Sequence, residues 1–308
     1  MGKDSSTIAG PGDLPSGHRS GFVAIFGRPN AGKSTLLNRI LGQKIAIVTP
    51  KPQTTRRRLL GVKTDPAWQI VFIDTPGYHR ASGLLNERMV ENALKALPDA
   101  DVILWMIDAE VGPDGLETEI AQKLPGRRSV VIALNKVDKV RKELLLPMIQ
   151  RMSQLAPGAD LIPVSALTGE GVPELMKSLV RELPEGPRFY SSDTLTNESE
   201  RGLIAEFVRE KVMLQTRQEV PYSVAVTVDS FEEKPDRNLS VIRATIHVER
   251  DSQKGILIGR GGQKLKVIGA GARRDAERLL GTRVFLELFV RVQREWTKRR
   301  GAFDEFGV

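Results

Sequence analysis

The pattern of apolar and polar positions divides the chain into two halves with different periodicities. In the first half, unbroken apolar runs such as 22–26 and 130–134 are followed by segments with the spacing of amphipathic helices. Unbroken apolar runs are typical of strands that are buried on both faces of a sheet. We therefore predict an α/β domain with a mixed, mostly parallel sheet and helices on both of its faces.

The second half has the pattern of a smaller α+β domain. Apolar residues between 203 and 212 are spaced for one helical face, and Pro221 ends that helix. Segments 222–233 and 238–250 alternate in period two, which predicts an antiparallel pair of strands. A short apolar segment, a glycine-rich loop at 259–262, a helix to about residue 280, a third strand and a basic terminal helix follow. The predicted order is α-β-β-α-α-β.

Local composition sets the predicted domain boundaries. Residues 1–20 are polar, rich in Gly, Ser and Pro, and lack the apolar core of a signal peptide, so we expect a flexible tail. Residues 185–197 contain proline and glycine and are predicted to link a first domain, 21–184, to a second domain, 198–308. A chain of 308 residues is long enough for two domains.

Overall composition narrows the class of protein. Hydrophobic residues make up 40% of the chain and charged residues 27%, which is typical of soluble globular proteins. No apolar run approaches the roughly 20 residues of a membrane span. The chain has no cysteine, which excludes disulfides and thiolate metal sites and favours a cytoplasmic protein.

Positive charge is concentrated near the carboxyl terminus. The formal net charge is +8, and segment 254–300 contains thirteen basic and four acidic residues, a net of +9, so the rest of the chain is near neutral. Such a segment suits a polyanion: nucleic acid first, and an anionic membrane surface second. A merely solvated basic face would have the same composition.

The segment GFVAIFGRPNAGKSTLLNRIL matches the phosphate-binding pattern G-x-x-x-x-G-K-[ST]. Its glycines let backbone amides wrap the phosphates, Lys33 places a charge near the β and γ oxygens, and Ser34 offers its hydroxyl to Mg²⁺. An apolar strand precedes the pattern and an amphipathic helix follows it, as the pattern requires. The predicted phosphate-binding residues are Gly27, Asn30, Ala31, Gly32, Lys33, Ser34, Thr35 and Gly77.

Two later motifs predict that the base is guanine. VVIALNKVD is a buried strand that delivers Asp138 to its carboxyl end, where open α/β sheets bind ligands. An aspartate there can accept the N1 and 2-amino hydrogens of guanine, which adenine does not present together. Downstream, LIPVSALTGEGV ends a strand at Ser165, and the backbone that follows can meet the guanine O6. The predicted guanine-binding residues are Asn135, Lys136, Asp138, Ser165, Ala166 and Leu167.

Two segments between these motifs are candidate switches. WQIVFIDTPGYH ends a strand at Asp74, whose carboxylate can reach a Mg²⁺ shell through water, and its glycine supplies a γ-phosphate amide and a movable backbone. In TPKPQTTRRR, Thr54 or Thr55 can close over Mg²⁺; we favour Thr55, because related switch segments keep a threonine directly before the arginine. We predict switch I as Gln53, Thr54, Thr55 and Arg56, switch II as Asp74, Thr75, Pro76, Gly77 and Tyr78, and the Mg²⁺ ligands as Ser34, Thr55 and, through water, Asp74.

Taken in order, GRPNAGKS, QTTRR, DTPG, NKVD and SAL resemble the five motifs of the translation-factor-like class of P-loop GTPases, over about 21–183. The resemblance implies Mg²⁺-dependent hydrolysis of GTP to GDP and phosphate. Tyr78 stands where Ras-like enzymes place the water-orienting glutamine, so we expect slow hydrolysis until a partner or a cation stimulates it. Asn30 matches an asparagine that ligates K⁺ in some related GTPases, and an ordinary turn residue at Asn30 stays an open alternative.

LIGRGGQKLK contains a second glycine-rich loop. A second nucleotide pocket would need a central strand, a Lys-Ser/Thr pair and a base motif, none of which is here, and an ordinary turn would not explain the basic residues. Within the predicted element order, Gly259-x-x-Gly262 resembles the loop of a type II KH domain, a module that clamps about four nucleotides of single-stranded nucleic acid. The resemblance implies RNA-binding residues Ile258, Gly259, Arg260, Gly261, Gly262, Lys264, Leu265, Lys266 and Arg273.

A GTPase domain followed by a KH domain resembles a family of bacterial ribosome-assembly GTPases, over 21–296. The resemblance implies binding of GTP and GDP, binding of the 3′ end of 16S ribosomal RNA through the KH domain, and a role in maturation of the small (30S) ribosomal subunit. It also implies a cytoplasmic protein with loose association at the inner face of the cell membrane, and we expect a monomer. In this hypothesis the nucleotide state changes the affinity for RNA.

Two other functions stay open on the sequence. A GTP-regulated membrane-surface protein without an RNA role would place the basic segment 294–300 on acidic lipids, with Trp296 and Phe303 as sparse apolar anchors. A non-catalytic scaffold would hold GTP without turnover, and Tyr78 keeps this alternative open for the basal rate.

Overall fold

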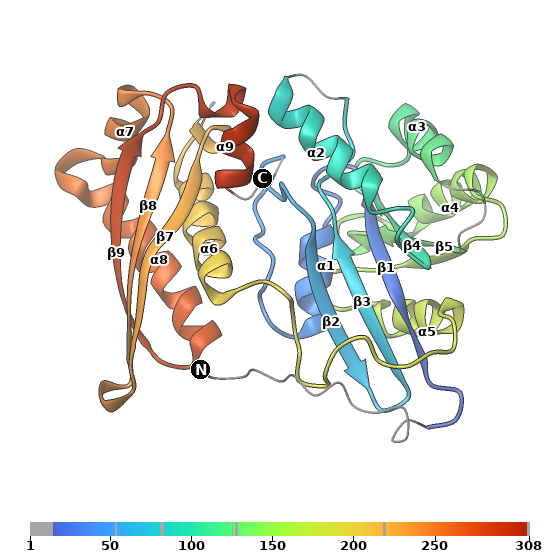
Figure 1. Cartoon of the computed structure of the whole chain (residues 1–308). Helices are drawn as coiled ribbons and strands as arrows, with labels where there is room; N and C mark the ends of the chain where they lie inside the picture. The colour runs from blue at the N-terminus through green and yellow to red at the C-terminus, as the bar shows by residue number, and fades with distance from the viewer. Residues whose placement is uncertain are drawn as a thin grey trace. The chain divides into compact units, whose positions relative to one another are not determined.

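A computed structural model describes residues 15–52, 54–80, 83–124, 126, 129–217 and 220–306 of the chain (Figure 1). Contacts divide the chain into two compact units: residues 1–43, 55–81 and 89–197 form the first, and residues 44–54, 82–88 and 198–308 form the second. Segments 44–54 and 82–88 therefore group with the second unit, although the sequence analysis places them inside the first domain. In the described part of the chain, no helix is both long and apolar enough to cross a membrane.

The first unit is built on a six-stranded sheet with the strand order β2-β3-β1-β4-β5-β6. The strands are β1 (Arg19–Gly27), β2 (Leu59–Asp65), β3 (Trp68–Asp74), β4 (Val102–Asp108), β5 (Ser129–Asn135) and β6 (Asp160–Pro163). Neighbouring strands run parallel except for β2, which pairs antiparallel with β3. The prediction of a mixed, mostly parallel sheet is confirmed.

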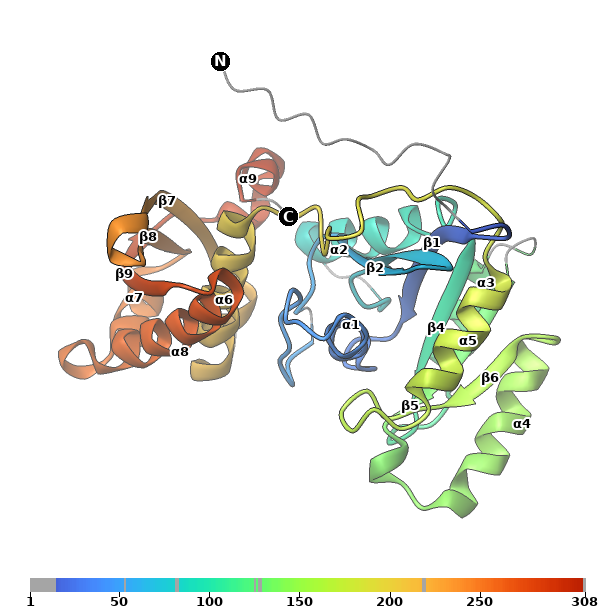
Figure 2. The ribbon, with the colours of Figure 1, turned by 90° about the horizontal axis from the view of Figure 1, so that it is seen from below.

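Helices connect these strands and lie on both faces of the sheet (Figure 2). They are α1 (Lys33–Leu41), α2 (Leu84–Lys95), α3 (Gly115–Lys123), α4 (Leu145–Leu155) and α5 (Val172–Glu182). Buried residues of α2, α3 and α4 share one core cluster with strand residues such as Phe26 and Trp105. Because helices cover both faces, every residue of β4 is buried, which accounts for its unbroken apolar run.

Local sequence signals set the ends of two helices near the site. Helix α1 begins directly after Gly32 and ends at Gly42, where a left-handed φ of 73° lets the Gly42 amide donate to the carbonyl of Asn38. Helix α3 begins with a capping box, in which Asp114 accepts a hydrogen bond from the first turn and Glu117 accepts one from the Asp114 amide. The phosphate-loop motif thus lies between a buried strand and a helix with a defined start.

The second unit contains a three-stranded sheet in the order β7-β8-β9, with helices packed against it (Figure 1). Its elements are α6 (Glu200–Gln215), β7 (Ala225–Lys234), β8 (Leu239–Val248), α7 (Asp251–Ile258), α8 (Gln263–Leu280) and β9 (Arg283–Val292). Strands β7 and β8 are antiparallel, whereas β8 and β9 are parallel. Val208 and Val212 of α6 and Ile268 and Ala272 of α8 pack on the sheet residue Ile246. The predicted α-β-β-α-α-β order is confirmed.

The expectation of a basic terminal helix at 294–300 is wrong. After β9 the chain forms a short 3-10 turn, Trp296–Lys298, and then a short helix, α9 (Arg300–Glu305). Trp296 is fully buried, its indole N–H donates to the carbonyl of Ser223 at 2.9 Å, and its ring meets Phe306 edge-on at 5.1 Å. Burial of a large aromatic ring outweighs the helix propensity of the surrounding lysines and arginines, which is favourable but worth only tenths of a kcal/mol per residue.

Candidate functional site

Three strands of the first unit deliver predicted site residues to one edge of the sheet. Strand β1 is parallel to both β3 and β4, and β4 is parallel to β5, so their carboxyl ends share this edge. Gly27 ends β1, Asp74 ends β3 and Asn135 ends β5. Ligands of open α/β sheets bind outside the carboxyl ends of the strands. The structure therefore brings the predicted phosphate, metal and base motifs together.

Two glycines of the phosphate loop are required by close packing. Gly27 has a φ of 146°, and a Cβ there would lie 2.4 Å from the carbonyl oxygen of Met106. Gly32 has a φ of 94°, and a Cβ there would lie 2.2 Å from the side-chain nitrogen of Asn135. Both distances are far below a van der Waals contact, and both φ values disfavour other residues. Side chains at these positions would deform the loop.

Lys33 lies over this loop and is buried. Its Nζ donates hydrogen bonds to the carbonyl oxygens of Gly27 at 3.2 Å and Arg28 at 2.9 Å. Burial lowers the pKa of Lys33 from 10.5 to about 8, against the opposing effect of the Asp74 carboxylate. A phosphate ligand would supply the negative charge that the lysine needs in order to stay protonated.

Three oxygen-bearing side chains converge beside Lys33. The Ser34 hydroxyl donates to Asp74 Oδ2 at 2.8 Å, and Ser34 Oγ and Thr55 Oγ1 are 3.0 Å apart. Asp74 is fully buried, and its Oδ1 has no hydrogen-bond partner among the described residues. Burial raises the pKa of the Asp74 carboxyl, although Lys33 and hydrogen bonds from Ser34 and Thr55 act in the other direction. Hard oxygen donors with one carboxylate are a set that fits Mg²⁺.

The remaining residues of predicted switch II pack against the phosphate loop. The Thr75 hydroxyl donates to the carbonyl of Ile25 at 2.7 Å, and a Cβ on Gly77 would lie 2.6 Å from Pro29. Tyr78 packs on the core cluster, with its ring 5.9 Å from that of Phe26. The tyrosine is therefore part of the packing of the first unit.

Asn135 joins the phosphate loop to the predicted base loop. It is only 2% exposed. Its side-chain nitrogen donates to the carbonyl of Ala31 at 2.7 Å, and its side-chain oxygen accepts from the amide of Ala166 at 2.9 Å. Asp138 is exposed at the same edge, in a 3-10 turn that follows Lys136. The guanine motif and the phosphate motif are thus one hydrogen-bonded structure.

Two residues of this site were missed by the sequence analysis. Asp108 accepts a hydrogen bond from Lys136 Nζ at 2.6 Å, and Arg39 of α1 donates to the carbonyls of Ala166 and Leu167. Asp108 carried a usable signal, because it ends a buried apolar run at the carboxyl edge of the sheet. The sequence gives no signal for Arg39, because its hydrogen-bond partners lie more than a hundred positions away in the chain.

The other predicted residues of the first half lie as follows. Asn30 adopts a left-handed φ of 62° in the phosphate loop, and Arg56 is buried. The hydroxyl of Thr54 lies 2.7 Å from that of Thr49 and does not join the group around Asp74. Gln53 lies outside the described residues. The roles assigned to all these side chains stay predictions.

The second glycine loop has the backbone that its sequence predicts. Gly259, Gly261 and Gly262 have φ values of 69°, 58° and 76°, all in the left-handed region. A Cβ on Gly259 would lie 2.8 Å from Lys264 Cβ, whereas one on Gly262 would meet no atom within 4 Å. The loop joins α7 directly to α8, whose first turn has no side-chain cap. Its amides can therefore face an anion.

Basic and apolar side chains surround this loop. Arg260, Lys266 and Arg273 are exposed, and Ile258, Lys264 and Leu265 are half-buried. Among the apolar residues of the two helices, Ile268 is in the core, whereas Ile256 and Val267 are exposed. The loop thus combines accessible backbone, cations and apolar side chains, which is the composition that a single-stranded nucleic acid requires.

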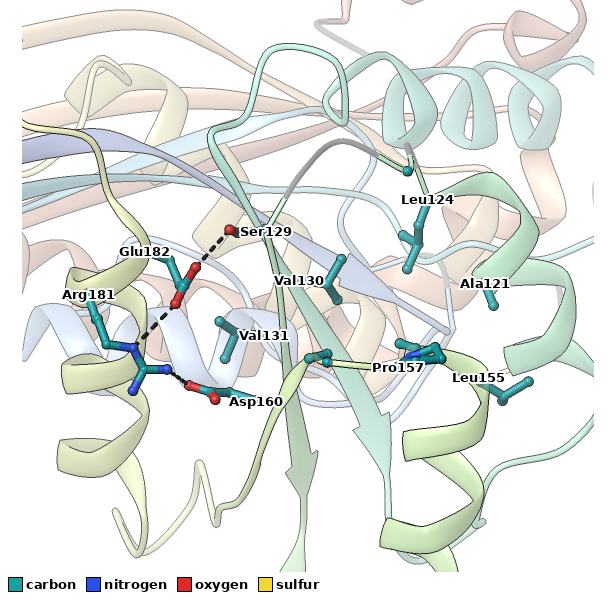
Figure 3. A pocket seen from close by; sticks show the side chains of 14 residues that line it. Ala121, Leu124, Ser129, Val130, Val131, Leu155, Pro157, Asp160, Arg181 and Glu182 are labelled. Atoms are coloured by element: carbon teal, nitrogen blue, oxygen red, sulfur yellow. Dashed lines mark hydrogen bonds and ion pairs between the residues drawn. The ribbon is translucent and has the colours of Figure 1, made fainter.

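A hollow of about 410 Å³ lies elsewhere on the first unit (Figure 3). It is at the amino ends of β5 and β6, whereas the predicted guanine site is at the carboxyl end of β5. Arg181 pairs with Asp160 and Glu182, and Glu182 accepts from Ser129 at 2.8 Å. Because its charged side chains pair with one another, the hollow presents no chemistry for a nucleotide.

Comparisons with known proteins match both halves of the chain. A family model described as a 50S ribosome-binding GTPase matches residues 22–136, and a KH domain model matches residues 219–297. The chain is 51% identical to GTPase Era of Syntrophus aciditrophicus (strain SB) over 291 residues, which are 94% of this chain and 95% of the relative. It is 54% identical to GTPase Era of Geotalea daltonii over 289 residues, covering 94% and 97%.

Two solved structures each match 94% of the chain. Era in complex with MgGDPNP and nucleotides 1506–1542 of 16S ribosomal RNA has a TM-score of 0.90 and 43% identity, covering 94% of this chain and 99% of that one. A point variant of Aquifex aeolicus Era bound to GDP·AlF4⁻ has a TM-score of 0.90 and 42% identity, with the same coverage. With a P-loop GTPase domain, a KH domain and this likeness over nearly its full length, the chain belongs to the GTPase Era family.

Proposed function

We propose that this GTPase is a Mg²⁺-dependent switch whose KH domain binds the 3′ region of 16S ribosomal RNA and assists maturation of the 30S subunit. The observation that carries the proposal is the double hydrogen bond of Asn135 to Ala31 and Ala166, which joins the phosphate loop and the base loop. The solved structure of Era with MgGDPNP and nucleotides of 16S ribosomal RNA supports binding of both a guanine nucleotide with Mg²⁺ and this RNA. The role in maturation follows from the identity of that RNA.

The phosphate side of the site is assigned to the loop from Gly27 to Ser34. Lys33 would exchange its two carbonyl partners for the β and γ oxygens, with its positive charge restored by the phosphates. Ser34 and Thr55 would ligate Mg²⁺ directly, and the free Oδ1 of Asp74 would accept from a metal-bound water. Mg²⁺ held by these residues would supply positive charge that offsets the negative charge of the phosphates during hydrolysis.

The base side is assigned to Asp138 and the Ala166 amide. Asp138 is exposed and can accept the N1 and 2-amino hydrogens of guanine, while Lys136 is held by Asp108. The packing of Tyr78 on the core supports a low basal rate, because no glutamine stands at that position to orient water. We propose that RNA or a cation raises the rate, with K⁺ at Asn30 as the candidate cation. Equal hydrolysis rates in K⁺ and Na⁺ buffers, with and without RNA, would exclude the K⁺ site.

RNA binding is assigned to the loop from Gly259 to Gly262 and its flanking cations. The exposed Arg260 and the half-buried Lys264 can pair with phosphates, and the amides in the first turn of α8 have no side-chain cap and can donate to an anion. A membrane-surface role is less well supported, because Trp296 and Phe303, the aromatic residues expected as anchors, are 0% and 4% exposed. The second unit therefore favours RNA as its polyanion.

Gly262→Asp against Gly262→Asn is the sharpest test of this assignment. The two variants have nearly the same shape, and both tolerate the positive φ better than other residues, but only aspartate adds a negative charge. Gly262→Asp is expected to weaken binding of a 16S 3′-end oligonucleotide at least about tenfold more than Gly262→Asn does. Both variants keep wild-type basal GTP turnover. Equal affinity in the two variants would count against the loop as the RNA clamp.

The switch is tested by measuring RNA affinity in each nucleotide state. A switch transmits only the difference in RNA affinity between states. Filter binding of the same oligonucleotide with GDP, with a GTP analogue and without nucleotide should give distinct dissociation constants. If the three dissociation constants are identical, nucleotide binding and RNA binding are independent and the protein is not a switch.

A further inference from the structure

Segment 44–54, directly before the predicted Mg²⁺ ligand Thr55, is bound to helix α6 within the second unit. Glu210 is 2% exposed, and its carboxylate accepts hydrogen bonds from Lys44 Nζ at 2.5 Å and from the amide of Val48 at 2.8 Å. Lys44 also pairs with Asp275 of α8 at 2.7 Å. A carboxylate that accepts a backbone amide in a buried setting fixes that backbone as well as the charge.

A second attachment lies at the carboxyl end of α6. Lys51 Nζ donates to the carbonyl oxygens of Met213 and Thr216, in the last turn of the helix and just after it. Terminal carbonyls of a helix have no partner within the helix and carry partial negative charge. The lysine therefore anchors the segment close to the predicted switch residues.

The third attachment is at Thr54, the residue directly before Thr55 in the chain. Arg209 is 3% exposed, and its guanidinium is held by Glu206, with Nε 2.8 Å from Oε1. The same guanidinium donates to the carbonyl oxygen of Thr54 at 2.5 Å. A guanidinium held on one side by a carboxylate has a defined direction for its remaining donors. Arg209 thus presents a fixed donor to one backbone carbonyl.

That carbonyl belongs to the peptide group that begins Thr55. The carbonyl of Thr54 and the amide of Thr55 lie in one rigid plane, because the peptide bond does not rotate freely. Thr55 Oγ1 lies 3.0 Å from Ser34 Oγ and 3.4 Å from Asp74 Oδ2. Fixing the carbonyl therefore restricts the direction in which the Thr55 side chain leaves the backbone.

We propose that Arg209 is a positioning residue for GTP hydrolysis, which acts by orienting the Thr54–Thr55 peptide so that the Thr55 hydroxyl faces Mg²⁺. The inference rests on the proposed function, since it takes Thr55 as a metal ligand. By linkage, occupation of the metal site strengthens the hydrogen bond from Arg209 to the same degree that Arg209 strengthens metal binding. Arg209 thereby affects metal binding through the Thr54–Thr55 peptide, without touching the nucleotide.

The test is a double-mutant cycle of Arg209→Gln and Thr55→Ala. The quantity measured is the Mg²⁺ concentration that gives half-maximal binding of a fluorescent nonhydrolysable GTP analogue. Each single variant is expected to raise this Mg²⁺ concentration about fivefold or more. The cause is the loss of one charge-assisted hydrogen bond in Arg209→Gln and of one metal ligand in Thr55→Ala. The double variant should equal Thr55→Ala alone, because Arg209 acts only through Thr55.

Controls separate positioning from a general loss of structure. Arg209→Lys keeps a positive donor and is expected to restore part of the Mg²⁺ affinity. GDP affinity measured in EDTA should be unchanged in Arg209→Gln, because that measurement does not use the metal. In the metal-free protein, amide hydrogen exchange of a peptide covering 48–58 should be faster in Arg209→Gln than in the wild type, which reports the peptide's order independently of nucleotide.

The outcomes distinguish the two levels of proposal. If Thr55→Ala leaves the Mg²⁺ dependence unchanged, Thr55 is not a ligand and the proposed function loses that assignment. If Thr55→Ala has its effect and Arg209→Gln has none, or if the two effects add, the positioning role of Arg209 is wrong while the proposed function stands. If both Arg209→Gln and Arg209→Lys lower the GDP affinity measured in EDTA, the positioning role is also wrong. That result would show that Arg209 only maintains the structure.

Discussion

Asn135 donates a hydrogen bond to the carbonyl of Ala31 at 2.7 Å, so the last residue of β5 holds the phosphate loop in place. A ligand that binds at either loop therefore finds the other already positioned. Preorganisation of this kind reduces the cost of ordering the site when the nucleotide binds.

Asn135→Ala removes both hydrogen bonds of this side chain and should lower GDP affinity about thirtyfold, for two buried hydrogen bonds of about 1 kcal/mol each. Stopped-flow displacement of a fluorescent GDP measures the effect, mostly as faster release. Lys139→Met is the matched control, because Lys139 lies in the 3-10 turn that closely follows Asn135 and pairs only with the exposed Glu110 among the partners described. Equal release rates in Asn135→Ala and wild type would contradict the bridging role.

Asp138→Asn should exchange the base preference. The carboxylate accepts two hydrogens from guanine, whereas an amide accepts one and donates one, which suits the 2-carbonyl and N1–H of xanthine. We expect GDP affinity to fall and xanthosine diphosphate affinity to rise, so that their ratio changes by at least about a hundredfold. Competition of both nucleotides against one fluorescent probe gives the ratio. An unchanged ratio would show that Asp138, exposed in the structure, does not read the base.

Lys33 predicts proton uptake on nucleotide binding. Its pKa is lowered to about 8 by burial, and bound phosphates favour the charged form, so binding of GDP should take up about half a proton at pH 8. GDP affinity should therefore fall as pH rises above 8. Calorimetry in buffers of different ionisation enthalpy measures the uptake. In Lys33→Arg the cation stays charged, and the affinity should not change between pH 7 and 9 through this group.

In the nucleotide-free protein, Lys33 makes the free energy of unfolding rise with pH, whereas it makes nucleotide affinity fall with pH. The unfolded chain keeps this lysine protonated up to its ordinary value of 10.5, whereas the folded chain releases the proton near pH 8. Between these values the unfolded state binds more protons, so the contribution of Lys33 to the free energy of unfolding rises with pH. Nucleotide affinity and nucleotide-free stability that both fell over this interval would contradict the lowered pKa.

The burial of Trp296 predicts that its substitution lowers the stability of the second unit alone. Its ring is fully buried and its N–H is paired with the Ser223 carbonyl, so Trp296→Ala should cost about 3–5 kcal/mol of unfolding free energy. Trp296→Phe keeps a ring against Phe306 and should cost less. Urea unfolding followed by amide exchange, with GDP bound to hold the first unit, measures the change. A loss below 1 kcal/mol in Trp296→Ala would contradict the packing.

Much of the site could be predicted from the sequence because its chemistry depends on backbone shape. Gly27 and Gly32 are required by contacts under 3 Å, and a loop with so little freedom leaves a recognisable spacing. The same holds for the second glycine loop, whose left-handed φ values need glycine at Gly259, Gly261 and Gly262. The apolar pattern was sufficient to predict the strands, because burial of one or both faces of a strand determines which of its positions are apolar.

The residues that escaped prediction act through contacts between distant parts of the chain. Arg39 and Arg209 are arginines in helices, where the sequence pattern of an exposed arginine and of a hydrogen-bonded one is the same. The sequence predicts a basic helix over 294–300, but the burial of Trp296 decides the course of this segment. Charge along a segment indicates solvent exposure and says little of where a neighbouring ring will pack.

Tyr78, at the position predicted to affect hydrolysis, also packs against the interior of the first unit. Because the half-buried phenol ring packs against Phe26, replacing it with the glutamine of Ras-like enzymes would remove contacts with the hydrophobic cluster. A substitution at this position would therefore alter packing as well as the surroundings of the nucleotide, so any change in its hydrolysis rate has to be compared at matched folding stability.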